Sequence, residues 1–225
     1  MKFRLMVVLG IVFLASQMSA AENLALKTQK DKVSYIIGMD IGKNMKLQAI
    51  DIDPEMIAKG IKDVLSGEKP SLSEQEINET MAAFQKEMMA KRQEIAKKNQ
   101  KEGESFLEEN KKKEGVKTLP SGLQYRVIKA GAGKKPKSTD TVTIHYRGTL
   151  VNGTEFDNSY RRWEPLSIPV KDVIPGWTEA LQLMEEGAKW QVFIPSNLAY
   201  GERGAGRDIG PNATLIFEIE LISIK

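Results

Sequence analysis

The sequence predicts an α+β protein in which a helical N-terminal half precedes an antiparallel sheet. Apolar residues recur at helical spacing in the first half of the chain, and they alternate at strand spacing after Gly115. One short amphipathic segment lies among the expected strands, so a single helix is available to cover the apolar face of the sheet.

The first 21 residues are typical of a signal peptide. Lys2 and Arg4 supply positive charge, Leu5 to Ala15 is an apolar run, and Ser19 to Ala21 offers small residues for cleavage. The apolar run is shorter than the ~20 residues that a membrane-spanning helix needs, which disfavours a retained anchor. We therefore expect export, with the periplasm as the favoured compartment and the outer membrane or cell surface as alternatives.

Charge and cysteine content exclude several classes of function. Without Lys2 and Arg4, 31 of the 33 basic residues remain against 30 acidic ones, and so balanced a chain gives little reason to expect a nucleic-acid partner. The chain has no cysteine, which excludes disulfides, thiol nucleophiles and thiolate zinc sites. No carboxylates and histidines cluster at metal-ligand spacing, so we expect neither a metal nor a cofactor.

Residues 22–70 are expected to form a helical dimerisation domain. An apolar residue recurs at every fourth position of the first helix, at Val33, Ile37, Ile41 and Met45. Asp53 and Pro54 are typical of the start of a second helix, and Gly67 of its end. About forty residues are too few to bury both apolar faces, so we expect a second copy of the chain to cover them.

Residues 71–115 are expected to form a long connecting helix. Ser73 and Glu76 match a capping box, and strong helix formers dominate the segment that follows. Apolar residues become sparse beyond Met88, so we expect the second half of this helix to be largely solvated. Gly103 is the expected weak point, and the continuity of the helix there stays open.

Residues 116–225 are expected to form the sheet. Alternation is clearest at Thr141–Arg147 and Leu215–Leu221, with a shorter apolar run at Trp190–Ile194. Asn152–Gly153 predicts a tight hairpin turn between two strands. Trp177–Glu186 predicts the one short helix, which Gly187 would end.

Conventional catalytic groups are missing from the chain. The only histidine, His145, lies among the polar positions of its strand, and we expect it to face solvent. Without another histidine or a cysteine, Ser-His-Asp and Cys-His arrangements cannot be built. If the protein is an enzyme, its reaction must therefore need little catalysis by an acid, a base or a nucleophile.

Six blocks of the C-terminal region occur in the order of a known family. They are Val142–Leu150, Asn152–Asp157, Val173–Trp177, Glu186–Ala188, Ile194–Gly201 and Ile209–Phe217. Together they resemble the FKBP-type peptidyl-prolyl cis/trans isomerases. The signal peptide and front helices are similar to those of the macrophage infectivity potentiator (Mip) group. The resemblance implies a half-barrel sheet wrapped around the short helix, with a proline pocket between them.

The resemblance also implies roles for individual residues. Asp157, Tyr200 and Trp177 would be catalytic, with Trp177 as the floor of the pocket and the other two at its rim. Substrate-binding residues would be Tyr146, Phe156, Arg162, Leu166, Ile168, Val173, Ile174, Ile209 and Phe217. The Tyr200 hydroxyl and the Ile174 amide would bond substrate carbonyls, and Arg162 would pair with Asp157. Buried aromatic residues are also what a core needs, and for Val142, Ile144 and Leu215 we prefer that interpretation.

The composition suits isomerisation of an X-Pro bond. Rotation crosses a barrier of roughly 18–20 kcal/mol set by amide resonance, and a dry aromatic pocket favours the twisted, less polar state without moving a proton. We expect a homodimeric isomerase (rotamase) that assists the folding of exported, proline-containing polypeptides and has chaperone activity. Macrolide-type inhibitors are expected in the pocket, with an affinity left open by Leu166 and Ile168. The alternatives are a non-enzymatic dimeric holding chaperone with a vestigial pocket, and a surface adhesin or coiled-coil spacer.

Overall fold

The structure is a computed structural model that describes residues 26–48 and 50–225. The expected signal peptide, residues 1–21, lies outside the described residues. The chain divides after Asp53 into two compact units. None of the described helices combines the length and the apolar character that crossing a membrane requires.

The first unit contributes helix α1, Gln29–Leu47. Thr28 caps the helix: its hydroxyl accepts the Asp31 amide at 3.1 Å, and the Asp31 carboxylate accepts the Thr28 amide at 2.8 Å. No residue of α1 is buried, and the side chains of Val33 and Ile37 are 44% and 55% exposed. Half of the predicted apolar face is therefore exposed, while Ile41 and Met45 are half-buried.

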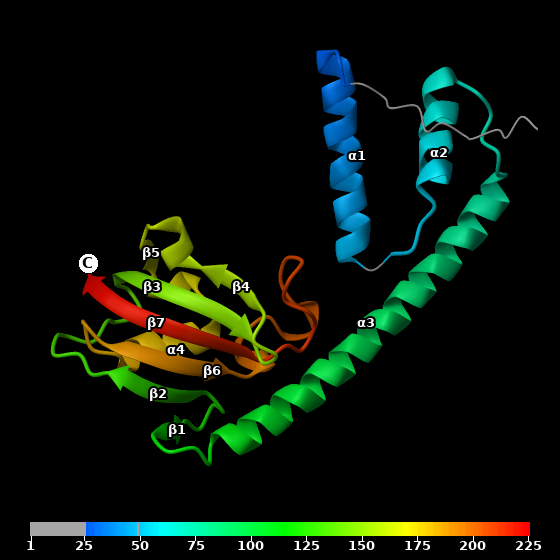
Figure 1. Cartoon of the computed structure of the whole chain (residues 1–225). Coiled ribbons are helices and arrows are strands. Elements are labelled where there is room, and N and C mark those ends of the chain that lie inside the picture. The colour runs from blue at the N-terminus through cyan, green and yellow to red at the C-terminus, as the bar shows by residue number, and fades with distance from the viewer. Residues whose placement is uncertain (1–25, 49) are drawn as a thin grey trace, which may run out of the picture. The chain divides into compact units, whose positions relative to one another are not determined.

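The second unit begins with two further helices, α2 (Pro54–Ser66) and α3 (Glu74–Asn110). Gly67 follows α2 with a φ of 71°, as a glycine after a helix end often does. The capping box at Ser73 forms as predicted, with hydrogen bonds in both directions between Ser73 and Glu76. Helix α3 then runs for 37 residues without a break at Gly103 (Figure 1).

Seven antiparallel strands form one sheet in the order β1-β2-β6-β7-β3-β4, with β5 also paired to β3 (Figure 1). Their bounds are Val116–Thr118, Gln124–Lys129, Thr141–Leu150, Glu155–Asn158, Leu166–Pro169, Lys189–Ile194 and Leu215–Ile224, for β1 to β7 in turn. Strands β3 and β7, of ten residues each, pair along their length at the centre. This half-barrel confirms the predicted fold class.

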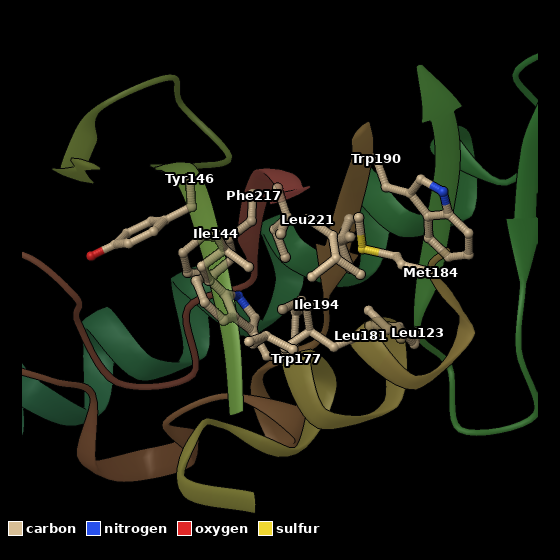
Figure 2. Close-up of a cluster of buried hydrophobic side chains, with 14 of the residues drawn as sticks. Leu123, Ile144, Tyr146, Trp177, Leu181, Met184, Trp190, Ile194, Phe217 and Leu221 are labelled. Carbon is tan, nitrogen blue, oxygen red and sulfur yellow. The ribbon is translucent and has the colours of Figure 1, made fainter. Parts of the chain in front are cut away.

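Helix α4, Pro175–Leu183, is the one α-helix among the strands. It ends three residues earlier than the predicted Glu186, because Met184 already has an extended conformation with a ψ of 141°. Its residue Leu181, together with Met184, is buried against Ile144 and Ile194 of the sheet (Figure 2). The core of the domain is therefore the α4–sheet interface, and the site described below lies at its aromatic end.

Most residues in the C-terminal half of α3 are exposed, as the sequence predicts, but one face of this half packs on the sheet domain. Gly103 and Asn110 are buried, and a Cβ added to Gly103 would overlap the hydroxyl of Thr214. The Asn110 amide donates to the Gln124 side chain at 3.0 Å, and Gln124 donates to a carbonyl of α3 at 2.9 Å. Apart from the Phe106 ring, which packs on Phe193 with centroids 5.8 Å apart, amides and a glycine make these contacts, so a search for apolar periodicity finds only part of them.

Candidate active site

A cleft of about 460 Å³ lies among the aromatic residues of the sheet, α4 and the loop between β6 and β7. All predicted site residues except Arg162 line it. They are Tyr146, Phe156, Asp157, Leu166, Ile168, Val173, Ile174, Trp177, Tyr200, Ile209 and Phe217. Sequence reasoning did not assign four further lining residues, Asp172, Ala205, Gly206 and Asp208. Each lies beside or between predicted residues, so adjacency in the chain was the available signal.

Packed aromatic rings form the floor of the cleft. Trp177, on the first turn of α4 after Pro175, is only 5% exposed. The rings of Tyr146 and Phe217 meet the Trp177 ring edge-on, with centroids 5.1 and 5.0 Å away, a favourable aromatic geometry. Figure 2 shows these three residues together, with the Tyr146 hydroxyl directed out of the cluster. The floor is therefore mostly apolar and largely closed to water.

Gly148 makes the close packing of the floor possible. A Cβ at this position would lie 2.5 Å from the Phe156 ring and 2.7 Å from the Phe217 ring. Those two rings are themselves packed edge-to-face, with centroids 5.5 Å apart. A larger residue at this position would therefore displace one or both rings.

Asp157 is held at the rim by three hydrogen bonds. Its carboxylate accepts the Tyr146 hydroxyl at 2.5 Å, Arg162 Nη1 at 2.5 Å and the Asn158 amide at 2.8 Å. Arg162 also donates to the Tyr146 hydroxyl at 2.9 Å, which closes a triangle of side chains. Arg162 thus contacts Asp157 and does not line the cleft.

The triangle sets the charge of each member. Burial would raise the pKa of Asp157, but the hydrogen bonds from Tyr146, Arg162 and the Asn158 amide outweigh it and hold that pKa below the ordinary value. Burial and the hydrogen bond to Asp157 raise the pKa of Tyr146, and the bond to Asp157 raises that of Arg162. At neutral pH the rim therefore carries a fixed carboxylate anion.

The hydroxyl of Tyr200 and the backbone amide of Ile174 have no acceptor among the described residues, and the buried Trp177 Nε1 of the floor also lacks one. The Tyr200 side chain is 40% exposed. Partial burial, and then the charge of Asp157, raise the pKa of its hydroxyl, so the hydroxyl keeps its proton at neutral pH. Both groups are free to donate to a carbonyl of a bound molecule.

His145 does not line the cleft, and its ring is half-buried rather than fully exposed to solvent. Its ring stacks on Tyr160 with a centroid distance of 4.6 Å, and its Nδ1 lies 3.0 Å from the hydroxyl of the buried Ser159. That hydroxyl also accepts the Tyr146 amide at 2.8 Å. These contacts fasten the 3-10 turn Ser159–Arg162 to β3, which explains how Arg162 reaches Asp157.

Trp163 follows that turn with an unusual conformation. It has a φ of 56°, in the left-handed region that favours glycine, and its side chain is 93% exposed.

Among the described residues, no group of His, Asp and Glu side chains could hold a metal ion. The cleft therefore combines an aromatic floor, an anionic rim and the open donors of Tyr200 and Ile174.

Comparison with known proteins identifies the family. Residues 30–127 match the domain amino terminal to FKBP-type peptidyl-prolyl isomerase, and residues 132–222 match the FKBP-type peptidyl-prolyl cis-trans isomerase domain. The outer membrane protein MIP of Legionella longbeachae is 48% identical over 229 residues, covering 100% of this chain and 98% of that protein. The chain belongs to the FKBP-type peptidyl-prolyl cis-trans isomerases.

Two further relatives support the same assignment and place the isomerase in the Mip and FkpA-like group. The peptidyl-prolyl cis-trans isomerase Mip of Coxiella burnetii is 45% identical and covers 89% of both chains. The crystal structure of FkpA from Escherichia coli matches with a TM-score of 0.64 and 40% identity, over 89% of this chain and 99% of that one. The isomerase is thus an enzyme, as the sequence predicts.

Proposed function

We propose that the isomerase catalyses rotation by enclosing the prolyl ring of a polypeptide on the Trp177 floor. Amide resonance places charge on the carbonyl oxygen, which water stabilises in the planar state. The packed rings of Tyr146, Trp177 and Phe217 exclude that water and favour the twisted, less polar transition state. The aromatic cleft with unpaired donors at its edge is the observation that carries this proposal.

The polar groups position the peptide and transfer no proton. The Tyr200 hydroxyl and the Ile174 amide, both without acceptors among the residues described, donate to carbonyls on either side of the proline. The Asp157 carboxylate, fixed by Tyr146 and Arg162, holds the chain at the rim. Trp177, Asp157 and Tyr200 are thus the catalytic residues of this proposal, and the other lining residues bind substrate. Macrolide-type inhibitors are proposed to bind in the same cleft, and Leu166 and Ile168 in its lining are the residues that set their affinity.

We further propose that the isomerase is an exported homodimer that assists protein folding and holds unfolded clients. Its N-terminal helices support this proposal, because apolar side chains on both helices are exposed in the single chain: Val33, Ile36, Ile37, Met56, Ile61 and Val64. The domains proposed are residues 1–21 as signal peptide, 22–70 for dimerisation, 71–115 as connecting helix and 116–225 for catalysis. The naming of the Legionella relative as an outer membrane protein supports export, with the periplasm as the favoured compartment.

Sedimentation of the mature chain tests the dimer. We expect a dimer for residues 22–225 and a monomer for Ile37→Glu, because a charge on the apolar face of α1 cannot be buried without a partner. Lys43→Glu, on an exposed position of the same helix, is the control and should remain dimeric. A monomeric wild-type chain at micromolar concentration would contradict the proposal.

A second experiment separates catalysis from the holding of clients. Tyr200→Ala and Asp157→Ala should lose the acceleration of proline-limited refolding but still suppress aggregation of a client. Deleting residues 22–70 should do the reverse: turnover of a short peptide persists, while refolding of a whole protein slows because clients no longer dwell near the cleft. Loss of aggregation suppression in the cleft variants would favour a single site for both activities.

A further inference from the structure

One wall of the cleft is a loop with little rigidity of its own. This wall loop, residues 200–212, contributes Tyr200, Ala205, Gly206, Asp208 and Ile209 to the cleft. Its glycines at 201, 204 and 206 all have positive φ values, between 55° and 62°, and glycine adopts many other conformations at small cost. Its internal backbone bonds are a pair between Ala205 and Ile209, at 2.9 and 3.2 Å, and two bonds to the Gly201 carbonyl, from the Gly204 amide at 3.3 Å and the Asn212 amide at 2.8 Å.

Helix α3 supplies the hydrogen bonds that the loop does not make for itself. Arg92 Nη2 donates to the backbone carbonyl of Arg203 at 2.7 Å and to that of Glu202 at 3.3 Å. Asn99 Nδ2 donates to the carbonyl of Pro211 at 2.8 Å. The helix therefore binds the loop backbone at both ends of the segment that carries Ala205 to Ile209.

Close approach adds to these bonds. A Cβ on Gly210 would lie 3.0 Å from Asn99 Nδ2 and 3.5 Å from Ile95 Cγ2, so the loop backbone rests directly on the helix. The contacts continue along the same helix face at four- and three-residue steps, through Gly103 to Asn110. This part of α3 is docked on the catalytic domain through polar and small residues, together with the Phe106 ring, whose centroid lies 5.8 Å from that of Phe193.

We infer that α3 is a positioning element for the catalytic cleft, in which Arg92 and Asn99 hold the wall loop in its substrate-binding conformation. Both are positioning residues, because they contact the backbone of the loop and neither lines the cleft. If the loop samples other conformations, the apparent affinity for substrate falls in proportion to the fraction of time it spends in the competent one. The inference deepens the proposed function, since it assigns to the connecting helix a part in substrate binding.

Kinetics of the mature full-length chain test this. In Arg92→Gln and Asn99→Ala, we expect KM for a short X-Pro peptide to rise about threefold or more with kcat little changed, because the competent fraction of the loop falls. Amide hydrogen exchange should accelerate at residues 204–209 and remain unchanged in β3. Arg92→Lys, which keeps one donor for these carbonyls, should recover part of the affinity.

Two controls distinguish positioning from general stability. Asn110→Ala removes the buried bond to Gln124 at the far end of the docked face, so it should lower the free energy of unfolding without changing KM. Lys101→Gln, an exposed position of α3, should change neither. Unchanged KM in Arg92→Gln and Asn99→Ala, or an equal rise in Asn110→Ala, would overturn the inference. Failure of the Tyr200 role would appear separately, as unaltered turnover in Tyr200→Phe.

Discussion

Replacing Tyr200 by phenylalanine isolates the proposed contact to the substrate carbonyl. The hydroxyl has no acceptor in the described part of the folded chain, so its removal breaks no internal bond and should change the free energy of unfolding by less than about 0.5 kcal/mol. A hydrogen bond to a neutral carbonyl contributes about 1 kcal/mol. The expected loss in kcat/KM is therefore about fivefold.

Tyr146→Phe is the matched comparison, because it also deletes one tyrosine hydroxyl, but one that makes hydrogen bonds within the protein. This hydroxyl donates to Asp157 and accepts from Arg162. A bond to a charged group contributes about 1.5–3 kcal/mol when buried, but the Asp157 side chain is 40% exposed and water replaces part of the bond. We expect a loss in unfolding free energy of about 1 kcal/mol.

Urea denaturation and a protease-coupled peptide assay on both variants distinguish a hydroxyl that binds substrate from one that stabilises the fold. Tyr200→Phe should affect turnover alone, and Tyr146→Phe should affect stability, with turnover following through Asp157. If Tyr200→Phe left turnover unchanged, or destabilised the fold as much as Tyr146→Phe does, the assignment of Tyr200 as a substrate donor would be refuted.

Three further predictions concern stability, measured by denaturation. The pKa of Asp157 lies below its ordinary value of 3.8, so its hydrogen bonds stabilise the fold at and above about pH 4 and are lost as the pH falls through the lowered pKa. Asp157→Asn should therefore be less stable than the wild type at pH 7 and should lack this loss of stability in acid. Parallel plots of unfolding free energy against pH for the two proteins would contradict the prediction. Gly103→Ala should destabilise the fold by about 1 kcal/mol, since overpacking against Thr214 exceeds the gain in helix propensity. Thr214→Ala should lower the unfolding free energy less in the Gly103→Ala protein than in the wild type. A gain of stability in Gly103→Ala would show that the contact can relax. Trp163→Gly should be about 1 kcal/mol more stable than Trp163→Ala, because only glycine adopts a φ of 56° without strain; equal stabilities would disprove the strain.

The sequence determined the order of elements and most of the cleft. Alternation along Thr141–Arg147 and Leu215–Leu221 predicted the two central strands, since one-sided burial imposes a period of two. The sequence also predicted the capping box at Ser73 and the end of the second helix at Gly67, because both signals act on residues that are close in the chain. The cleft residues followed from a family resemblance, because six motifs in order specify the fold that brings them together.

Tertiary structure decided the contacts that polar side chains make across long sequence separations. The charge-rich composition around Gly103 predicted a solvated, weakened helix, whereas amides at Asn99 and Asn110 and the glycine itself dock it on the catalytic domain. His145 likewise occupies a polar strand position but packs on Tyr160. Apolar burial is periodic and therefore visible in a sequence, while the partner of a hydrogen-bonding group is known only when the chain has folded.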